Sequence, residues 1–129
     1  KLKGILNGID TSFYNPETDT ALFKNYNIES LKNKYYNKSA LQGMVGLPQN
    51  IDIPVIALIS RLVRHKGLDL IVQGIEEVLK EKTQLIILGK GDRDYELYFK
   101  SLQEKYHDKV AIMLLNPKNA IIKYYNYKC

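Results

Sequence analysis

A short cationic stretch contains the residues best suited to chemistry in this sequence. Arg61, Arg64, His65 and Lys66 follow one another closely and precede Gly67. Arginine can hold phosphate oxygens as a fork, lysine acts as a point charge, and glycine lets a ligand approach the backbone. If a helix follows, its N-terminus adds free N–H groups and partial positive charge, so the pattern predicts an anion site, most often for phosphate. The alternative is a loop of solvated cations.

A second glycine-containing turn, Gly89-Lys90-Gly91, precedes Asp92. Such a turn can bring backbone close to the ribose or base of a nucleotide. The Gly-x-Gly pattern alone is weak evidence, because many turns between strands and helices use glycine for geometry only. The sequence contains neither a Walker pattern nor a full dinucleotide-binding fingerprint.

Other kinds of site find little support. Catalysis by His65 or His107 is disfavoured, and His107 lies near a predicted helix end, where cations are favoured for structural reasons. Nothing resembles a catalytic triad or has metal-ligand spacing. The single cysteine, Cys129, excludes an internal disulfide and a multi-cysteine zinc site. We therefore expect no metal and no cofactor.

Alternating strand and helix patterns place both turns. Apolar runs predict strands at 55–59, 85–88 and 110–114, the first of them buried on both faces as parallel strands are. Apolar residues at helical spacing predict helices at 68–80 and 93–106, with Asp92 capping the second. This order predicts an α/β fold, a Rossmann-like parallel β-α-β-α-β sheet. Both turns then follow strands at the edge where such sheets bind ligands.

The chain divides into three regions. Residues 1–50 are a lead-in segment with turns and a short helix near 38–45, which Gly46 and Pro48 end. Within the lead-in we expect 20–37 on the surface and only Ile5 to Phe13 packed. Residues 51–115 form the Rossmann-like half-domain. Residues 116–129 are a divergent tail with at most a short helix at 120–125.

Composition narrows the class of protein. The 129 residues are 45% hydrophobic and 26% charged, which excludes a wholly disordered chain. No apolar run is long enough to span a membrane, and no signal-peptide pattern opens the chain. The net charge of +5 comes mostly from scattered lysines. It would suit nucleic acid, an anionic membrane or a phosphorylated small molecule, and we interpret it mainly as compositional bias.

Several segments together resemble bacterial glycogen synthases and plant starch synthases. They keep their order and spacing from about residue 4 to residue 112. The phosphate loop of that family resembles Ser60-Arg61-Leu62-Val63-Arg64-His65-Lys66-Gly67-Leu68-Asp69-Leu70, and its next glycine turn is similar to Leu88-Gly89-Lys90-Gly91-Asp92. The remaining matches are Leu6-Asn7-Gly8-Ile9-Asp10, Tyr14-Asn15-Pro16, Thr18-Asp19, Lys38-Ser39-Ala40-Leu41-Gln42 and Gly46-Leu47-Pro48.

This resemblance implies a function. The family has the B-type glycosyltransferase fold, and this chain would be part of its C-terminal domain. It transfers glucose from ADP-glucose to the non-reducing end of an α-1,4-glucan with retention. Arg61 and Lys66 would hold the diphosphate and stabilise the leaving group, and Gly67, Gly89 and Gly91 would complete the substrate site. The location would be cytoplasmic in a bacterium and plastidial in a plant or alga.

Departures from the family keep other readings open. The Lys-Thr-Gly-Gly-Leu loop of its N-terminal domain and its later Glu-x7-Glu type segment are missing, so we expect a fragment that is inactive alone. One alternative is part of a B-type glycosyltransferase that uses another nucleotide sugar. Another is a non-catalytic module that binds a nucleotide or glucan. Only the charge supports a nucleic-acid binder, and we expect neither nucleic acid nor membrane as a partner.

Overall fold

The protein is an α/β structure built on a small parallel sheet. This computed structural model describes residues 3–5 and 8–114. The strands are β1 (Val55–Ile59), β2 (Gln84–Leu88) and β3 (Val110–Met113), in the order β1-β2-β3 and all parallel. Helices α2 (Leu68–Lys80) and α3 (Arg93–Lys105) connect them. The predicted β-α-β-α-β sheet is confirmed, with each predicted boundary correct to within one residue.

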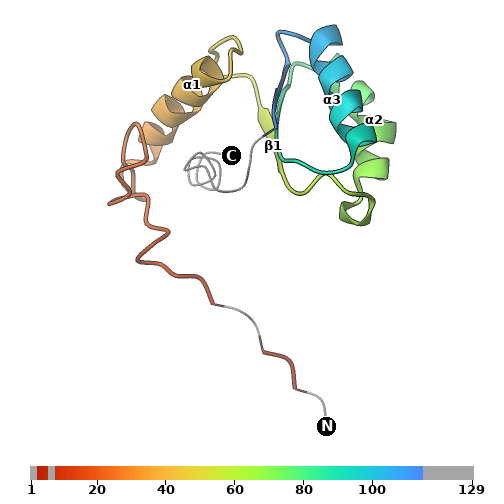
Figure 1. The fold of residues 1–129 in the computed structure, drawn as a ribbon. Coiled ribbons are helices and arrows are strands. Elements are labelled where there is room, and N and C mark those ends of the chain that lie inside the picture. The colour runs from red at the N-terminus through yellow and green to blue at the C-terminus, as the bar shows by residue number, and fades with distance from the viewer. Residues whose placement is uncertain (1–2, 6–7, 115–129) are drawn as a thin grey trace.

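Helices cover both faces of the sheet. Figure 1 shows α2 and α3 on one face and helix α1 (Lys34–Met44) on the other side. Two apolar clusters correspond to these faces. The larger consists of Leu62, Leu68, Ile75, Leu79, Leu85, Ile87, Phe99, Leu102 and Val110. The smaller consists of Leu41, Leu47, Ile86, Leu88 and Ala111.

The prediction that the first strand is buried on both faces is wrong. No residue of β1 is buried, and Ile56 and Ile59 are 40% and 37% exposed. The reason is position, because β1 is an edge strand and only β2 has a neighbour on each side. An apolar run therefore identified the strand correctly but not its surroundings.

The lead-in helix begins earlier than the sequence predicted. A one-turn 3-10 helix, η1 (Leu31–Asn33), leads directly into α1 at Lys34, so part of the predicted surface excursion is helical. Asn37 is fully buried, and its amide makes two hydrogen bonds to the backbone of Lys24 (3.0 and 2.7 Å). The Asn37 side chain therefore links the turn around Lys24 to α1. Gly46 ends the helix region with a φ of 75°, as predicted.

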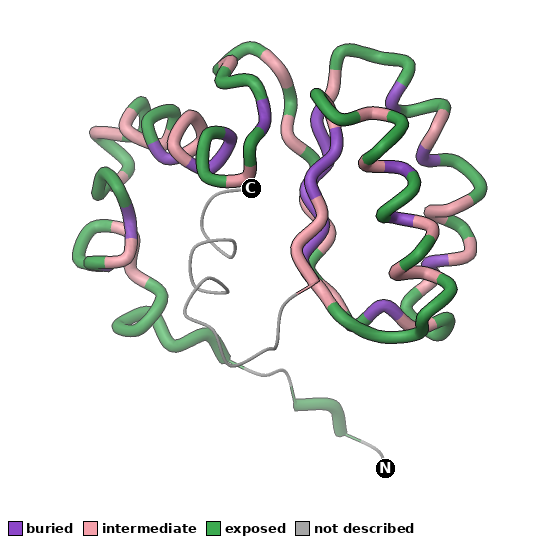
Figure 2. Tube along the Cα trace, turned by 45° about the horizontal axis from the view of Figure 1, so that its top comes forward, coloured by how far each residue is buried: buried purple, intermediate pink, exposed green. Residues whose placement is uncertain are grey.

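The described residues of the stretch from Ile5 to Phe13 are exposed, contrary to the expected packing. Ile5, Ile9 and Phe13 are 90%, 78% and 47% exposed. Figure 2 shows residues 8–13 as an exposed tube that lies away from the buried strands of the sheet. In the supposed surface excursion, Leu22 is only 8% exposed, although most residues from 20 to 37 are exposed or half-buried as predicted.

The predicted tail, including the short helix at 120–125, lies outside the described residues. Among the helices of the described part, none has the length and apolar character needed to cross a membrane.

Candidate anion-binding site

Two loops leave the sheet on the same side, at the edge formed by the carboxyl ends of its parallel strands. Ile59 of β1 is paired with Leu88 of β2, so the strands end side by side. The cationic loop, residues 60–67, follows β1, and the glycine turn, residues 89–92, follows β2. The predicted site residues Arg61, Lys66 and Gly67 lie on the first loop, and Gly89 and Gly91 lie on the second. The structure therefore brings both loops to the edge where parallel sheets bind ligands.

Backbone hydrogen bonds join the loops beyond the ends of the strands. The Leu62 N–H donates to the Lys90 carbonyl (3.1 Å), and the Asp92 N–H donates to the Leu62 carbonyl (2.8 Å). These bonds form an isolated parallel bridge between Leu62 and Gly91. The Leu62 side chain is fully buried in the larger apolar cluster. Arg61, next to this anchor, is thus carried on a fixed backbone.

The close approach of the loops explains both turn glycines. A Cβ on Gly89 would lie 2.1 Å from the Ser60 carbonyl oxygen, and one on Gly91 would lie 2.2 Å from the Leu62 carbonyl oxygen. Neither glycine has a positive φ. Their role here is to let two backbones touch, which is the geometric reading that the sequence left open. This packing role does not test the predicted contact of Gly89 and Gly91 with substrate, which remains a prediction.

Gly67 is required for a different reason. Its φ of 73° and ψ of 22° place it in the left-handed region, between the one-turn 3-10 helix η2 (Arg64–Lys66) and α2. A Cβ there would meet no atom within 4 Å, so the position is open as well as strained for other residues. In the first turn of α2, the N–H groups of Leu70 and Ile71 donate to the Gly67 carbonyl (3.2 and 3.4 Å), so the earlier N–H groups are the ones that could meet an anion. This geometry suits an approaching anion.

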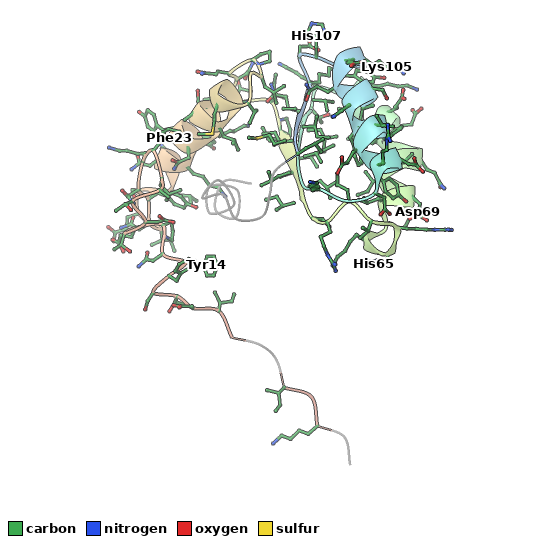
Figure 3. The ribbon with its side chains drawn as sticks, viewed as in Figure 1. Tyr14, Phe23, His65, Asp69, Lys105 and His107 are labelled. Atoms are coloured by element: carbon green, nitrogen blue, oxygen red, sulfur yellow. The ribbon has the colours of Figure 1, made fainter. Side chains whose placement is uncertain are left out.

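The four cations of the loop are all exposed. Arg64, His65 and Lys66 form η2, and Arg61 precedes Leu62. Neither ion pair within the described ranges includes any of them. Figure 3 shows His65 and Asp69 at one end of the part formed by the sheet, α2 and α3, and Lys105 and His107 at its opposite end. His107 is therefore remote from this edge. The described residues include no group of three or more acidic, histidine or cysteine side chains able to hold a metal.

Sequence reasoning missed three participants and misjudged a fourth. Leu62 forms the backbone bridge to Gly91, the Lys90 carbonyl accepts one of its hydrogen bonds, and Glu96 accepts a hydrogen bond from the Gly91 N–H (3.0 Å). A lone apolar residue inside a cationic loop was the available signal for Leu62. Asp92 occupies the N-cap position of α3, but its side chain makes no capping hydrogen bond, so the predicted cap is wrong in its chemistry. The carboxylate that bonds back to the turn is that of Glu96.

Comparison with known proteins defines the class. The chain belongs to the glycosyl transferases of group 1, whose family description matches residues 47–129. It is 47% identical over 114 residues to a glycogen synthase of Bacillus cereus strain B4264, covering 88% of this chain and 24% of that protein. It is 49% identical over 110 residues to a glycogen synthase of Clostridium perfringens strain 13, covering 85% of this chain and 23% of that protein.

A solved structure has the same fold. The catalytic domain of starch synthase IV from Arabidopsis thaliana, bound to ADP and acarbose, superimposes with a TM-score of 0.82 at 34% identity. The superposition covers 96% of this chain and 26% of the plant chain. This chain thus spans about a quarter of the length of the relatives that it matches. The family and fold implied by the resemblance are confirmed.

Proposed function

We propose that this chain supplies the part of a glycogen or starch synthase active site that binds the nucleoside diphosphate of the donor. The reaction is transfer of glucose from ADP-glucose to the non-reducing end of an α-1,4-glucan with retention. The observation that carries the proposal is the cationic loop fastened by backbone bonds to the glycine turn at the ligand-binding edge. Likeness to an ADP-bound starch synthase supports the choice of nucleotide. The location follows the source, cytoplasm in a bacterium and plastid in a plant or alga.

Arg61 and Lys66 hold the diphosphate in this proposal. When the bond between glucose and diphosphate breaks, negative charge grows on the departing ADP. Fixed cations at that position stabilise the transition state more than the ground state, so they assist the chemistry as well as binding. Gly67, Gly89 and Gly91 complete the substrate site by keeping backbone close to the nucleotide. The acceptor glucan would be the second substrate.

Calorimetric titration with ADP tests the assignment of the loop. We expect Arg61→Ala and Lys66→Ala each to weaken ADP binding by about ten- to a hundredfold, the effect of losing a charge-assisted hydrogen bond. Arg64→Ala should change it by less than about threefold, as expected for a solvated charge. Lys82→Ala is the matched control, since Lys82 is exposed and precedes β2 at the opposite edge of the sheet.

Two outcomes would count against the proposal. Equal losses at Arg61, Lys66 and Arg64 would indicate a diffuse electrostatic field instead of a site. Unchanged ADP affinity in Arg61→Ala or Lys66→Ala would remove the nucleotide-sugar assignment of the loop. Parallel titrations with UDP and GDP test the nucleotide, and binding of either more tightly than ADP would favour a related transferase with another donor.

A further inference from the structure

The Glu96 carboxylate reaches back from α3 to the turn that precedes it. Its Oε1 atom accepts a hydrogen bond from the Gly91 N–H at 3.0 Å. Glu96 lies in the first turn of α3, where a negative charge is also favoured by the helix dipole. The dipole alone would be served equally by Asp94, which is exposed in the same turn. The bond to Gly91 is specific to Glu96.

Gly91 is the point where the two loops touch. It is bridged to Leu62, and the atom nearest to its hypothetical Cβ is the Leu62 carbonyl oxygen. Hydrogen bonds on either side of Gly91 bind Leu62 through Lys90 and Asp92. A contact that fixes Gly91 therefore fixes Leu62, and Leu62 directly follows Arg61. Contacts through Gly91 and Leu62 thus link the Glu96 carboxylate to the backbone of Arg61.

We propose that Glu96 is a positioning residue for the diphosphate site. Its carboxylate holds the glycine turn against Leu62 and so keeps Arg61 in place for the ligand; this inference rests on the proposed function. It also sharpens the role of Gly91. Because the Gly91 N–H already donates to Glu96, it is not free to donate to substrate, and Gly91 contributes a close backbone approach instead.

Two substitutions separate the hydrogen bond from the charge. Glu96→Gln keeps an oxygen that accepts from the Gly91 N–H but removes the negative charge. Glu96→Ala removes both. Glu104→Ala is the matched control, because Glu104 is an exposed glutamate further along α3. We expect Glu96→Ala to weaken ADP binding about three- to tenfold, and Glu96→Gln and Glu104→Ala to stay within about twofold of the unsubstituted chain.

Amide hydrogen exchange provides a readout that needs no nucleotide. In Glu96→Ala, exchange should accelerate at Gly91, Leu62 and Asp92 and stay unchanged in the amides that join β2 to its neighbours. Glu96→Gln should restore the slower exchange. Uniform acceleration throughout the sheet would mean a general loss of stability and would overturn the positioning role.

The outcomes distinguish this inference from the proposed function. If the unsubstituted chain binds ADP and Glu96→Ala binds it equally well, only the positioning role is overturned. The same holds if Glu96→Gln loses as much affinity as Glu96→Ala, because the charge would then be the cause. If Arg61→Ala and Lys66→Ala leave ADP binding unchanged, the proposed function fails, and the positioning of Arg61 for a diphosphate fails with it.

Discussion

Strands β1 and β2 are similar in sequence and differ in burial. β1 reads Val-Ile-Ala-Leu-Ile and β2 reads Gln-Leu-Ile-Ile-Leu, and they pair residue for residue. All five residues of β2 are buried, whereas none of β1 is. The cause is that β2 lies between two strands and β1 has a partner on one side only. Apolar composition thus selects a strand, and the neighbours of that strand decide how much of it is buried.

The largest expected effect of this difference is on stability. Ile87→Ala should lower the free energy of unfolding by about 2–5 kcal/mol, because the side chain of Ile87 is fully buried and its removal leaves a cavity. Ile56→Ala, the matched change on β1, should cost less than about 1 kcal/mol, since Ile56 is already 40% exposed. Urea unfolding followed by circular dichroism measures both. Equal losses would show that the edge of β1 is as well packed as the centre.

The loops that continue these strands provide the second comparison. Gly91→Ala places a Cβ 2.2, 2.6 and 2.8 Å from backbone atoms of Leu62, none of which can move aside without breaking the bridge. We expect a loss of about 2–3 kcal/mol, as for other overpacked sites. Gly74→Ala is the control, because its Cβ meets no atom within 4 Å and it lies inside α2. That change should stabilise the protein by about 0.5–1 kcal/mol. Thermal unfolding measures both variants, and an unchanged stability of Gly91→Ala would contradict this prediction.

The sequence was sufficient for the elements of the sheet and for the position of the loops. Continuous apolar runs predicted all three strands, and apolar residues at helical spacing predicted both crossover helices. Each pattern matches the one regular structure that places those apolar residues in the core. It was insufficient for the lead-in. The buried amide of Asn37 is satisfied by two hydrogen bonds to the backbone of Lys24, and a contact between residues so far apart in sequence leaves no periodic signal.

The site was predicted in outline for a similar reason. The cluster of basic residues and the two glycines can be recognised in a short stretch of sequence, so both loops could be predicted. The Leu62 bridge and the bond from Gly91 to Glu96 depend on how two loops meet in space. Glycine is equally compatible with a ligand and with a neighbouring backbone, and only the structure reveals that Gly89 and Gly91 face Ser60 and Leu62.

The start of β2 carries the third expected effect. Gln84 is the one polar residue in β2, and it is 1% exposed. Its amide donates to the Pro48 carbonyl (2.9 Å) and accepts from the buried Gln42 amide (2.7 Å). Gln84→Leu removes both bonds and leaves the Pro48 carbonyl without this donor, so we expect a loss of about 1–2 kcal/mol in urea unfolding. Gln73→Leu, on the exposed face of α2, should be nearly neutral. A stabilising Gln84→Leu would show that β2 gains more from apolar burial than from its link to the lead-in.

The smallest effect concerns the helices that bury β2. Glu76 on α2 pairs with Lys105 on α3 and accepts a hydrogen bond from the Tyr106 hydroxyl (3.2 Å). The hydrogen bond from Lys105 is the main cause that lowers the pKa of the Glu76 carboxyl below its ordinary value of 4.5. A carboxyl whose pKa is lowered by folding adds stability above the ordinary pKa and loses it as pH falls through the folded pKa. Both side chains are largely exposed, so the gain is small.

Thermal unfolding between pH 7 and pH 3 tests this pair. The unsubstituted protein should lose Tm more steeply below about pH 4.5 than Lys105→Ala, in which the pKa of Glu76 returns toward its ordinary value. Lys100→Ala is the control, because Lys100 is an exposed lysine of α3 that is not among the groups that shift the pKa of Glu76. Identical pH profiles for Lys105→Ala and the unsubstituted protein would mean that this surface pair does nothing to hold α2 and α3 together. The burial of β2 would then depend on the apolar cluster alone.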